Sequence, residues 1–94
     1  MNIELIVQLV KERLGIKTNI RDMYLIAIAR GVVAELEDEK GLTLDSASPN
    51  HLIFVVDYAS WRYQNKDSDK GMPRDLQFRL HNLYINARGD SNYV

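Results

Sequence analysis

The stretch SPNHLIFVVDYASWRYQN, residues 48–65, decides the fold. Ser48 is a preferred helix N-cap, and Pro49 suits the first helical position because its missing N–H would have no partner there. Apolar residues recur along the segment at helical spacing, and only a few polar side chains interrupt them. A helix that is apolar nearly all round is either buried or turned toward a partner. The segment is therefore expected to be a central helix of an all-α domain.

Two apolar stripes run along this helix. The first is expected to face the core and consists of Leu52, Val55, Val56, Ala59 and Tyr63. The second has residues at i, i+4 and i+7 and consists of Phe54, Tyr58 and Trp61. Together they give the helix more apolar surface than a four-helix monomer needs. The surplus suggests a contact with another molecule, and burial within the subunit is the alternative.

Three further segments, residues 3–14, 20–40 and 73–88, show the same helical period. Asn2 can cap the first segment, and Gly15 suits the left-handed position after its end. No segment sustains the two-residue alternation of a half-buried strand. The sequence predicts a single all-α domain of about four helices, two longer central ones and short flanking ones, with no substantial sheet.

The segment 20–40 carries three further signals. Thr18 or Asn19 can cap its start. Small side chains form a flat strip: Ala27, Gly31 and Ala34. Because glycine inside a helix costs about 1 kcal/mol relative to alanine, we expect another helix to approach this strip closely. The segment finishes with an acidic run, residues 35–39. This run is interpreted as a solvated face, and the alternative is a docking patch for a basic partner.

Composition limits the possible functions. The 94 residues have a globular mix of 46% apolar and 27% charged side chains. A net charge of −1 gives no strong basic field for nucleic acid. The absence of cysteine excludes disulfides and thiolate metal sites. We expect no membrane span and no signal peptide, because no apolar run approaches about 20 residues and the first residues are not basic. The helical domain is expected over residues 1–89, with a flexible tail at 90–94.

No catalytic set emerges from the residue types and their spacing. Ser60, His81 and Asp57 can be combined only on paper, since Ser60 does not lie on a nucleophile-elbow sequence. His51 and His81 lack the spacing of metal ligands and are expected to be a cap neighbour or partly exposed. Phosphate-binding glycine motifs are absent from the sequence. We therefore expect that the protein is not an enzyme and binds neither a cofactor nor a metal ion.

Asp57 stands out because it interrupts the most apolar helix, where an unpaired charge would be costly. It is expected at the helix surface or paired with an arginine such as Arg30, Arg62 or Arg74. The alternative is a specificity residue at a subunit contact. Arg62 is expected to lie over an aromatic ring at the helix end, and arginine beside aromatic residues is also typical of protein interfaces.

A longer pattern connects these elements. It comprises DYASWRY at 57–63, a polar loop, GMPR at 71–74 and LQFRLHNL at 76–83. This series resembles the small head–tail connector proteins of tailed bacteriophages and prophages. The opening, with LGI at 14–16, is similar too, so that the resemblance covers residues 3–86.

The resemblance implies a non-enzymatic adaptor of the virion neck, without cofactors. Connectors form a ring, usually dodecameric, beneath the portal protein, where they extend the DNA channel and join head to tail. The implied partners are the portal, neighbouring copies, a downstream neck or tail-completion protein and double-stranded DNA in transit, but no membrane. The implied location is the virion, and the host bacterial cytoplasm during assembly.

Within that interpretation, six residues are candidates for subunit or partner contacts: Phe54, Tyr58, Trp61, Arg62, Phe78 and Ile85. Trp61→Ala and Phe54→Asp are expected to impair assembly more than folding. The polar loop at 66–72 and the tail at 90–94 are expected to be flexible and to become ordered on docking.

The alternative interpretation is a small helical DNA-binding regulator of phage origin. The segment 73–88 would then be the recognition helix, because its polar side chains include types that hydrogen-bond to base edges. These are Arg74, Gln77, Arg79 and Asn82. DNA binding that weakens with salt would support this alternative.

Overall fold

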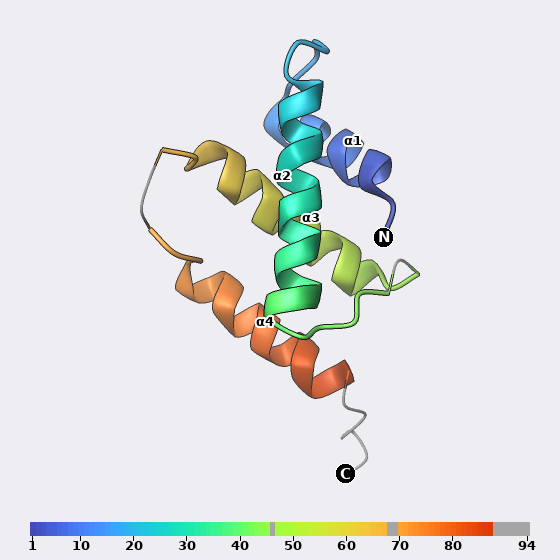
Figure 1. Cartoon of the computed structure of the whole chain (residues 1–94), viewed down its shortest axis with the longest axis vertical. Helices are drawn as coiled ribbons and strands as arrows, with labels where there is room; N and C mark the ends of the chain where they lie inside the picture. Colours follow the sequence, from blue (N-terminus) through green and yellow to red (C-terminus); the bar gives the residue numbers. More distant parts are fainter. Residues whose placement is uncertain (46, 68–69, 88–94) are drawn as a thin grey trace.

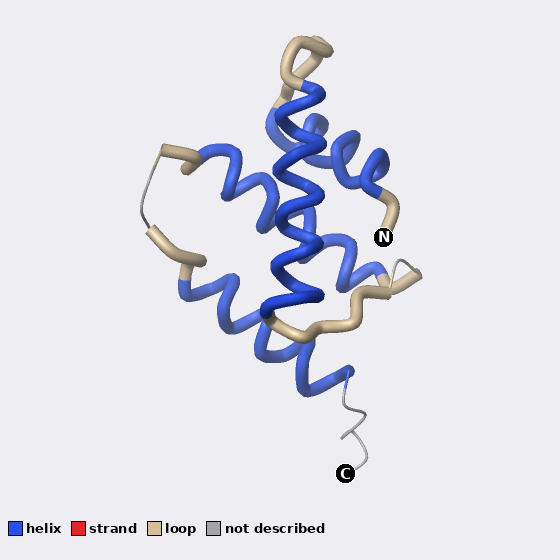
Figure 2. Tube along the Cα trace, in the orientation of Figure 1, coloured by secondary structure: helices blue, strands red, loops and turns tan. Residues whose placement is uncertain are grey.

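The computed structural model is built entirely of helices, with a π-helical turn continuing the second (Figure 1). In chain order the elements are α1 (Ile3–Leu14), α2 (Asp22–Ala34), η1 (Glu35–Glu39), α3 (Pro49–Gln64) and α4 (Arg74–Ala87). The structure describes residues 1–45, 47–67 and 70–87, with only the backbone of the last two. No strand occurs among these residues (Figure 2). The prediction of one all-α domain of four helices is confirmed, while the predicted tail lies outside the described residues.

Several helix ends follow the predicted signals. The Asn2 side chain accepts a hydrogen bond from the Leu5 N–H at 3.1 Å at the start of α1. Gly15 ends α1 with a φ of 73°, a left-handed conformation that favours glycine. Ser48 caps α3 by accepting from the His51 N–H at 3.4 Å. These local signals set the ends of α1 and the start of α3.

The start of α2 differs from the prediction. The helix begins at Asp22, and the residue before it makes no side-chain cap. Asn19 does not cap the helix, because its side-chain oxygen accepts from Lys11 Nζ at 3.0 Å. Asp22 also binds Lys11 Nζ, at 2.8 Å. The buried Lys11 ammonium needs these partners, and it takes the side chain that was expected to cap α2.

The prediction of a close helix contact at Gly31 is wrong. Gly31 and both alanines of the strip are exposed, and a Cβ added at Gly31 would meet no atom within 4 Å. The strip lies on the face of α2 opposite its buried stripe, which includes Leu25 and Val32. The small residues therefore face solvent in the isolated chain.

The π-helical turn ends the long second helix. The Lys40 N–H donates to the Glu35 carbonyl at 3.0 Å, a bond that spans five residues rather than four. Gly41 follows with a φ of 68°, and the Leu42 N–H donates back to the Leu36 carbonyl at 2.9 Å. Leu36 and Leu42 are both buried, so this turn brings the chain back onto the core.

Helices α1, α2 and α3 pack against one another, whereas α4 packs only against α3. In Figure 1, α4 lies beside α3 and runs back in the opposite direction. The core is one cluster of buried apolar residues: Ile6, Val7, Val10, Leu25, Ala29, Val32, Leu36, Leu42, Phe54, Val55, Val56, Tyr58, Ala59, Leu76, Leu80 and Leu83. None of the helices in the described ranges is long and apolar enough to cross a bilayer.

Candidate functional site

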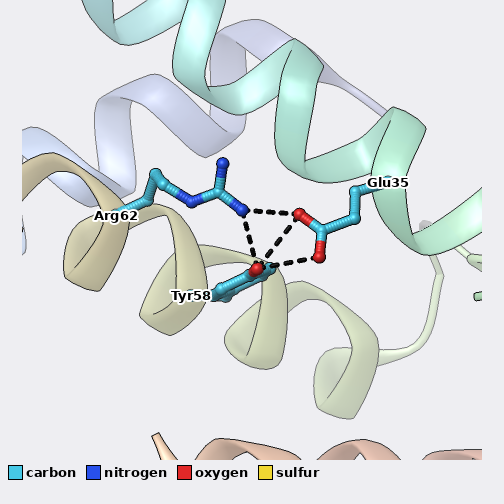
Figure 3. A network of polar contacts seen from close by, with 3 residues as sticks. All are labelled: Glu35, Tyr58 and Arg62. Atoms are coloured by element: carbon cyan, nitrogen blue, oxygen red, sulfur yellow. Dashed lines mark hydrogen bonds and ion pairs between the residues drawn. The ribbon is translucent and has the colours of Figure 1, made fainter. Parts of the chain in front are cut away.

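A polar network joins the end of α2 to α3 (Figure 3). Glu35 opens η1, and Tyr58 and Arg62 lie one turn apart on α3. The Tyr58 hydroxyl donates to the Glu35 carboxylate, with oxygen distances of 2.9 and 3.0 Å. Arg62 Nη2 donates to Glu35 Oε1 at 2.5 Å and to Tyr58 Oη at 2.7 Å. The three side chains satisfy one another and leave the network without net charge.

Burial of the network changes how its groups ionise. Tyr58 is 2% exposed, and its ring lies between Phe54 and Trp61 with both centroids 6.2 Å away. Burial raises the pKa of Tyr58 above its ordinary value of 10.0, and the hydrogen bond from Arg62 opposes part of that rise. Burial lowers the pKa of Arg62, but the bonds to Tyr58 and Glu35 outweigh it, so that the pKa is raised overall.

We predict that Tyr58 ionises later than a free tyrosine. Because its folded pKa lies above the unfolded one, the stability it contributes is present below pH 10 and lost as the pH rises through the raised value. Because the pKa of Tyr84 is raised as well, titration of tyrosinate absorbance should show a late component from both residues, and Tyr58→Phe should remove the part that belongs to Tyr58. Tyr24→Phe, which removes an exposed hydroxyl, should leave that component unchanged. Loss of the late component in both variants would contradict the assignment.

A hollow of about 530 Å³ lies beside the network, between η1, α3 and α4. Its polar lining adds Lys40, Gln77, His81 and Tyr84 to the three network residues. The Tyr84 hydroxyl donates to the Lys40 carbonyl, which ties α4 to the end of η1. Partial burial raises the pKa of Tyr84. The hollow thus carries groups of both charges, and its carboxylate is already bonded.

The structure does not bring Ser60, His81 and Asp57 together as a catalytic triad. Ser60 is fully buried, and its Oγ has no hydrogen-bond partner in the described part of the chain. His81 lines the hollow beside Tyr58, whereas Asp57 lines another hollow with Trp61. His51 is a cap neighbour as predicted, since its Nδ1 accepts from the Asp45 N–H at 2.9 Å. Within residues 1–45, 47–67 and 70–87, no group of three potential metal ligands occurs.

Asp57 is paired, as predicted, but with different arginines from those expected. Its two carboxylate oxygens bind Arg13 Nη1 at 2.9 Å and Arg79 Nη1 at 2.7 Å. The three residues come from α1, α3 and α4, so one carboxylate connects three helices. The Asp57 side chain is only 18% exposed, which strengthens these pairs relative to ordinary surface pairs.

We predict that Asp57→Asn lowers the free energy of unfolding by about 1–2 kcal/mol, because both arginines lose their anionic partner. Urea unfolding followed by circular dichroism measures this change. Asp38→Asn removes a carboxylate that is exposed and has no ion pair within the described chain, and it should change stability by less than about 0.5 kcal/mol. Equal effects of the two variants would contradict the bridging role.

The structure divides the six predicted contact residues. Phe54 and Tyr58 are 1% and 2% exposed and belong to the core, which corrects the expectation that they face a partner. The reason is that α3 contacts all three other helices, so both of its stripes are covered within the chain. Trp61 and Arg62 are half-buried, and Arg62 lies 5.1 Å from the Tyr58 ring centroid, the predicted stacking on an aromatic ring.

The remaining two candidates lie on the outside of α4. Phe78 is 68% exposed and Ile85 is 43% exposed. They are seven residues apart and therefore share one face. That face is opposite the buried stripe of α4, formed by Leu76, Leu80 and Leu83. The isolated chain leaves this second stripe uncovered.

A second exposed apolar site was missed by sequence reasoning. Ile20, in the turn between α1 and α2, is 87% exposed, and Met23, in the first turn of α2, is 85% exposed. A signal for it existed, because neither residue falls on the buried stripe of α2 that contains Leu25 and Ala29. The turn between α1 and α2 lies at one end of the molecule (Figure 1), and the exposure of the two side chains leaves them accessible to a partner.

Two of the four polar residues expected to read DNA from α4 make hydrogen bonds or ion pairs within the chain. Arg79 binds Asp57, and Gln77 Nε2 donates to the Met72 carbonyl at 2.7 Å. Arg74 and Asn82 are exposed. Among the described residues, neither side chain makes a hydrogen bond or an ion pair, so these two of the four are available to a partner.

No protein-family model matches this chain, and neither the curated proteins nor the solved structures contain a significant match to it. The resemblance to head–tail connectors therefore stays a prediction. The evidence for a function comes from the uncovered surfaces and the charges described above.

Proposed function

We propose that this protein is a non-enzymatic assembly subunit that resembles phage head–tail connectors. It forms a ring beneath the portal, extends the DNA channel and joins head to tail. The observation that carries the proposal is the second apolar stripe of α4, Phe78 and Ile85, which the chain itself leaves uncovered. A further copy or a partner would remove this surface from water.

The stripe favours an assembly role for a physical reason. Single exposed apolar residues are normal on protein surfaces and need no explanation. Here two large ones share one face of a helix whose opposite face is already packed, and Ile53 is also 51% exposed on the neighbouring α3. Aligned apolar side chains of this kind are typical of contact sites.

The connector class is supported by the sequence pattern over residues 3–86 and by the charge of the chain. A net charge of −1 suits a subunit around a DNA channel, because strong phosphate binding would hinder movement of the DNA. The proposed partners are the portal protein, neighbouring copies and the next neck component. The proposed location is the virion neck.

The test measures binding to the portal protein encoded with this chain by co-sedimentation. Phe78→Ser combined with Ile85→Ser should weaken binding at least about tenfold, because two apolar contacts are lost. Leu5→Ser alters a side chain on α1 that is 42% exposed and should bind as the parent chain does. Unchanged binding of the double variant, or no binding of the parent chain, would contradict the proposal.

A further inference from the structure

The turn between α1 and α2 carries cations as well as apolar side chains. We call Lys17, Ile20, Arg21 and Met23 the basic tip. Arg21 donates to the Tyr63 hydroxyl at 3.1 Å, and neither cation of the tip has an ion pair within the described chain. The nearby Asp22 is already paired with Lys11. The tip therefore presents two cations beside two highly exposed apolar side chains.

The opposite end of the long second helix carries carboxylates. We call Glu37, Asp38, Glu39 and Ile85, the residue that follows Tyr84 in α4, the acidic end. The three carboxylates are exposed and have no ion pair within the described residues. The bond from Tyr84 to the Lys40 carbonyl brings this part of α4 alongside η1. Since Lys40 follows the run, the net charge of residues 37–40 is −2.

These carboxylates are unfavourably placed for the isolated chain. The C-terminus of a helix carries a partial negative charge, which repels acidic side chains. No basic residue occurs in the last turn of α2 or in η1. A cationic partner at this end would offset the repulsion, and apolar side chains on that partner would cover Ile85.

The basic tip and the acidic end cannot meet within one chain. The continuous run of α2 and η1 separates them, with Asp22 at one end and Glu39 at the other (Figure 1). At 1.5 Å per residue, this run is about 27 Å long. Charges interact over about 8 Å at physiological salt. The two surfaces are therefore complementary to each other and can meet only between two copies of the chain.

We infer that the basic tip of one copy docks on the acidic end of the next. Lys17 and Arg21 would face the carboxylates, and Ile20 and Met23 would cover Ile85. The inference rests on the proposed function and specifies which surfaces meet between neighbouring subunits. The contact uses two different surfaces, so it can propagate from copy to copy and close into a ring. Tip-to-tip and end-to-end contacts are disfavoured because they bring like charges together.

The test is a charge exchange measured by sedimentation velocity over a concentration series. The tip variant is Lys17→Glu with Arg21→Glu, and the end variant is Glu37→Lys with Glu39→Lys. Each variant alone should self-associate at least about tenfold more weakly than the parent chain. An equimolar mixture should regain association, because both possible contacts between the two variants join opposite charges. The acidic tip of the tip variant meets the basic end of the end variant, and the basic tip of the end variant meets the acidic end of the tip variant.

Arg30→Glu is the matched control, since Arg30 is an exposed cation midway along α2 and outside both surfaces. It should associate as the parent chain does.

A parent chain that stays monomeric at low salt, variants that associate normally, or a mixture that stays dissociated would each overturn the inference. Portal binding by variants that associate normally would reject this contact and uphold the proposed function. Restored association of the mixture without any portal binding would uphold the contact and reject the function.

Discussion

Phe54→Ala is expected to lower the free energy of unfolding by about 3–5 kcal/mol, because it opens a cavity at the centre of the domain. Phe54 is 1% exposed, and its ring packs beside Tyr58 with the Arg79 guanidinium 5.5 Å from its centroid. Phe54→Asp should be worse, since it also buries a charge. Urea unfolding followed by circular dichroism measures both variants.

Phe78→Ala is the matched control for this prediction. It removes the same aromatic side chain from a position that is 68% exposed and should change stability by less than about 0.5 kcal/mol. The comparison separates the two phenylalanines by burial, one in the core and one on the exposed stripe of α4. If Phe54→Ala folds with normal stability and loses only assembly, the original assignment of Phe54 to a contact surface is restored.

Leu80→Ala is expected to lower the stability of α4 by about 2–5 kcal/mol while leaving the other helices folded. The reason is that α4 packs only against α3, through Leu76, Leu80 and Leu83. The hydrogen bond from Tyr84 to Lys40 and the Arg79–Asp57 ion pair also hold α4, but they lie partly at the surface.

Amide hydrogen exchange distinguishes this local effect from global unfolding. In Leu80→Ala, the amides of α4 should exchange much faster than those of α1, α2 and α3. Val10→Ala is the comparison, because Val10 lies in the three-helix body and its loss should accelerate exchange throughout the domain. Equal acceleration of all helices in Leu80→Ala would show that α4 is not a separate unit.

Local signals explain why the helices themselves were predictable. The apolar period gives the four segments, and Asn2, Gly15 and Ser48 set ends that depend on neighbouring residues alone. The start of α2 was not predictable in this way. It depends on Lys11, which belongs to another helix and becomes buried only when the fold forms.

Burial was harder to predict than helix formation. Periodicity tells which residues share a face, but not how many neighbours a helix has. The stripe of Phe54 and Tyr58 is expected to face a partner because the helix has more apolar surface than a four-helix monomer needs, with burial within the subunit as the alternative. In the structure α3 has three neighbours, which cover both stripes. Phe78 and Ile85 stay exposed because α4 has one neighbour.

The polar contacts show the same limit. An arginine partner for Asp57 was expected from the cost of an unpaired charge, but Arg13 and Arg79 lie on helices whose arrangement the sequence pattern does not reveal. The bond between Glu35 and Tyr58 joins residues 23 positions apart for the same reason. The basic tip could have been found, since its apolar residues lie off the core stripe.

Electron microscopy of the purified chain, alone and mixed with the portal protein proposed as its partner, tests the proposed function most directly. We expect rings of the chain alone or an added layer of density on the portal. A monomer that leaves the portal unchanged at low and physiological salt would contradict it.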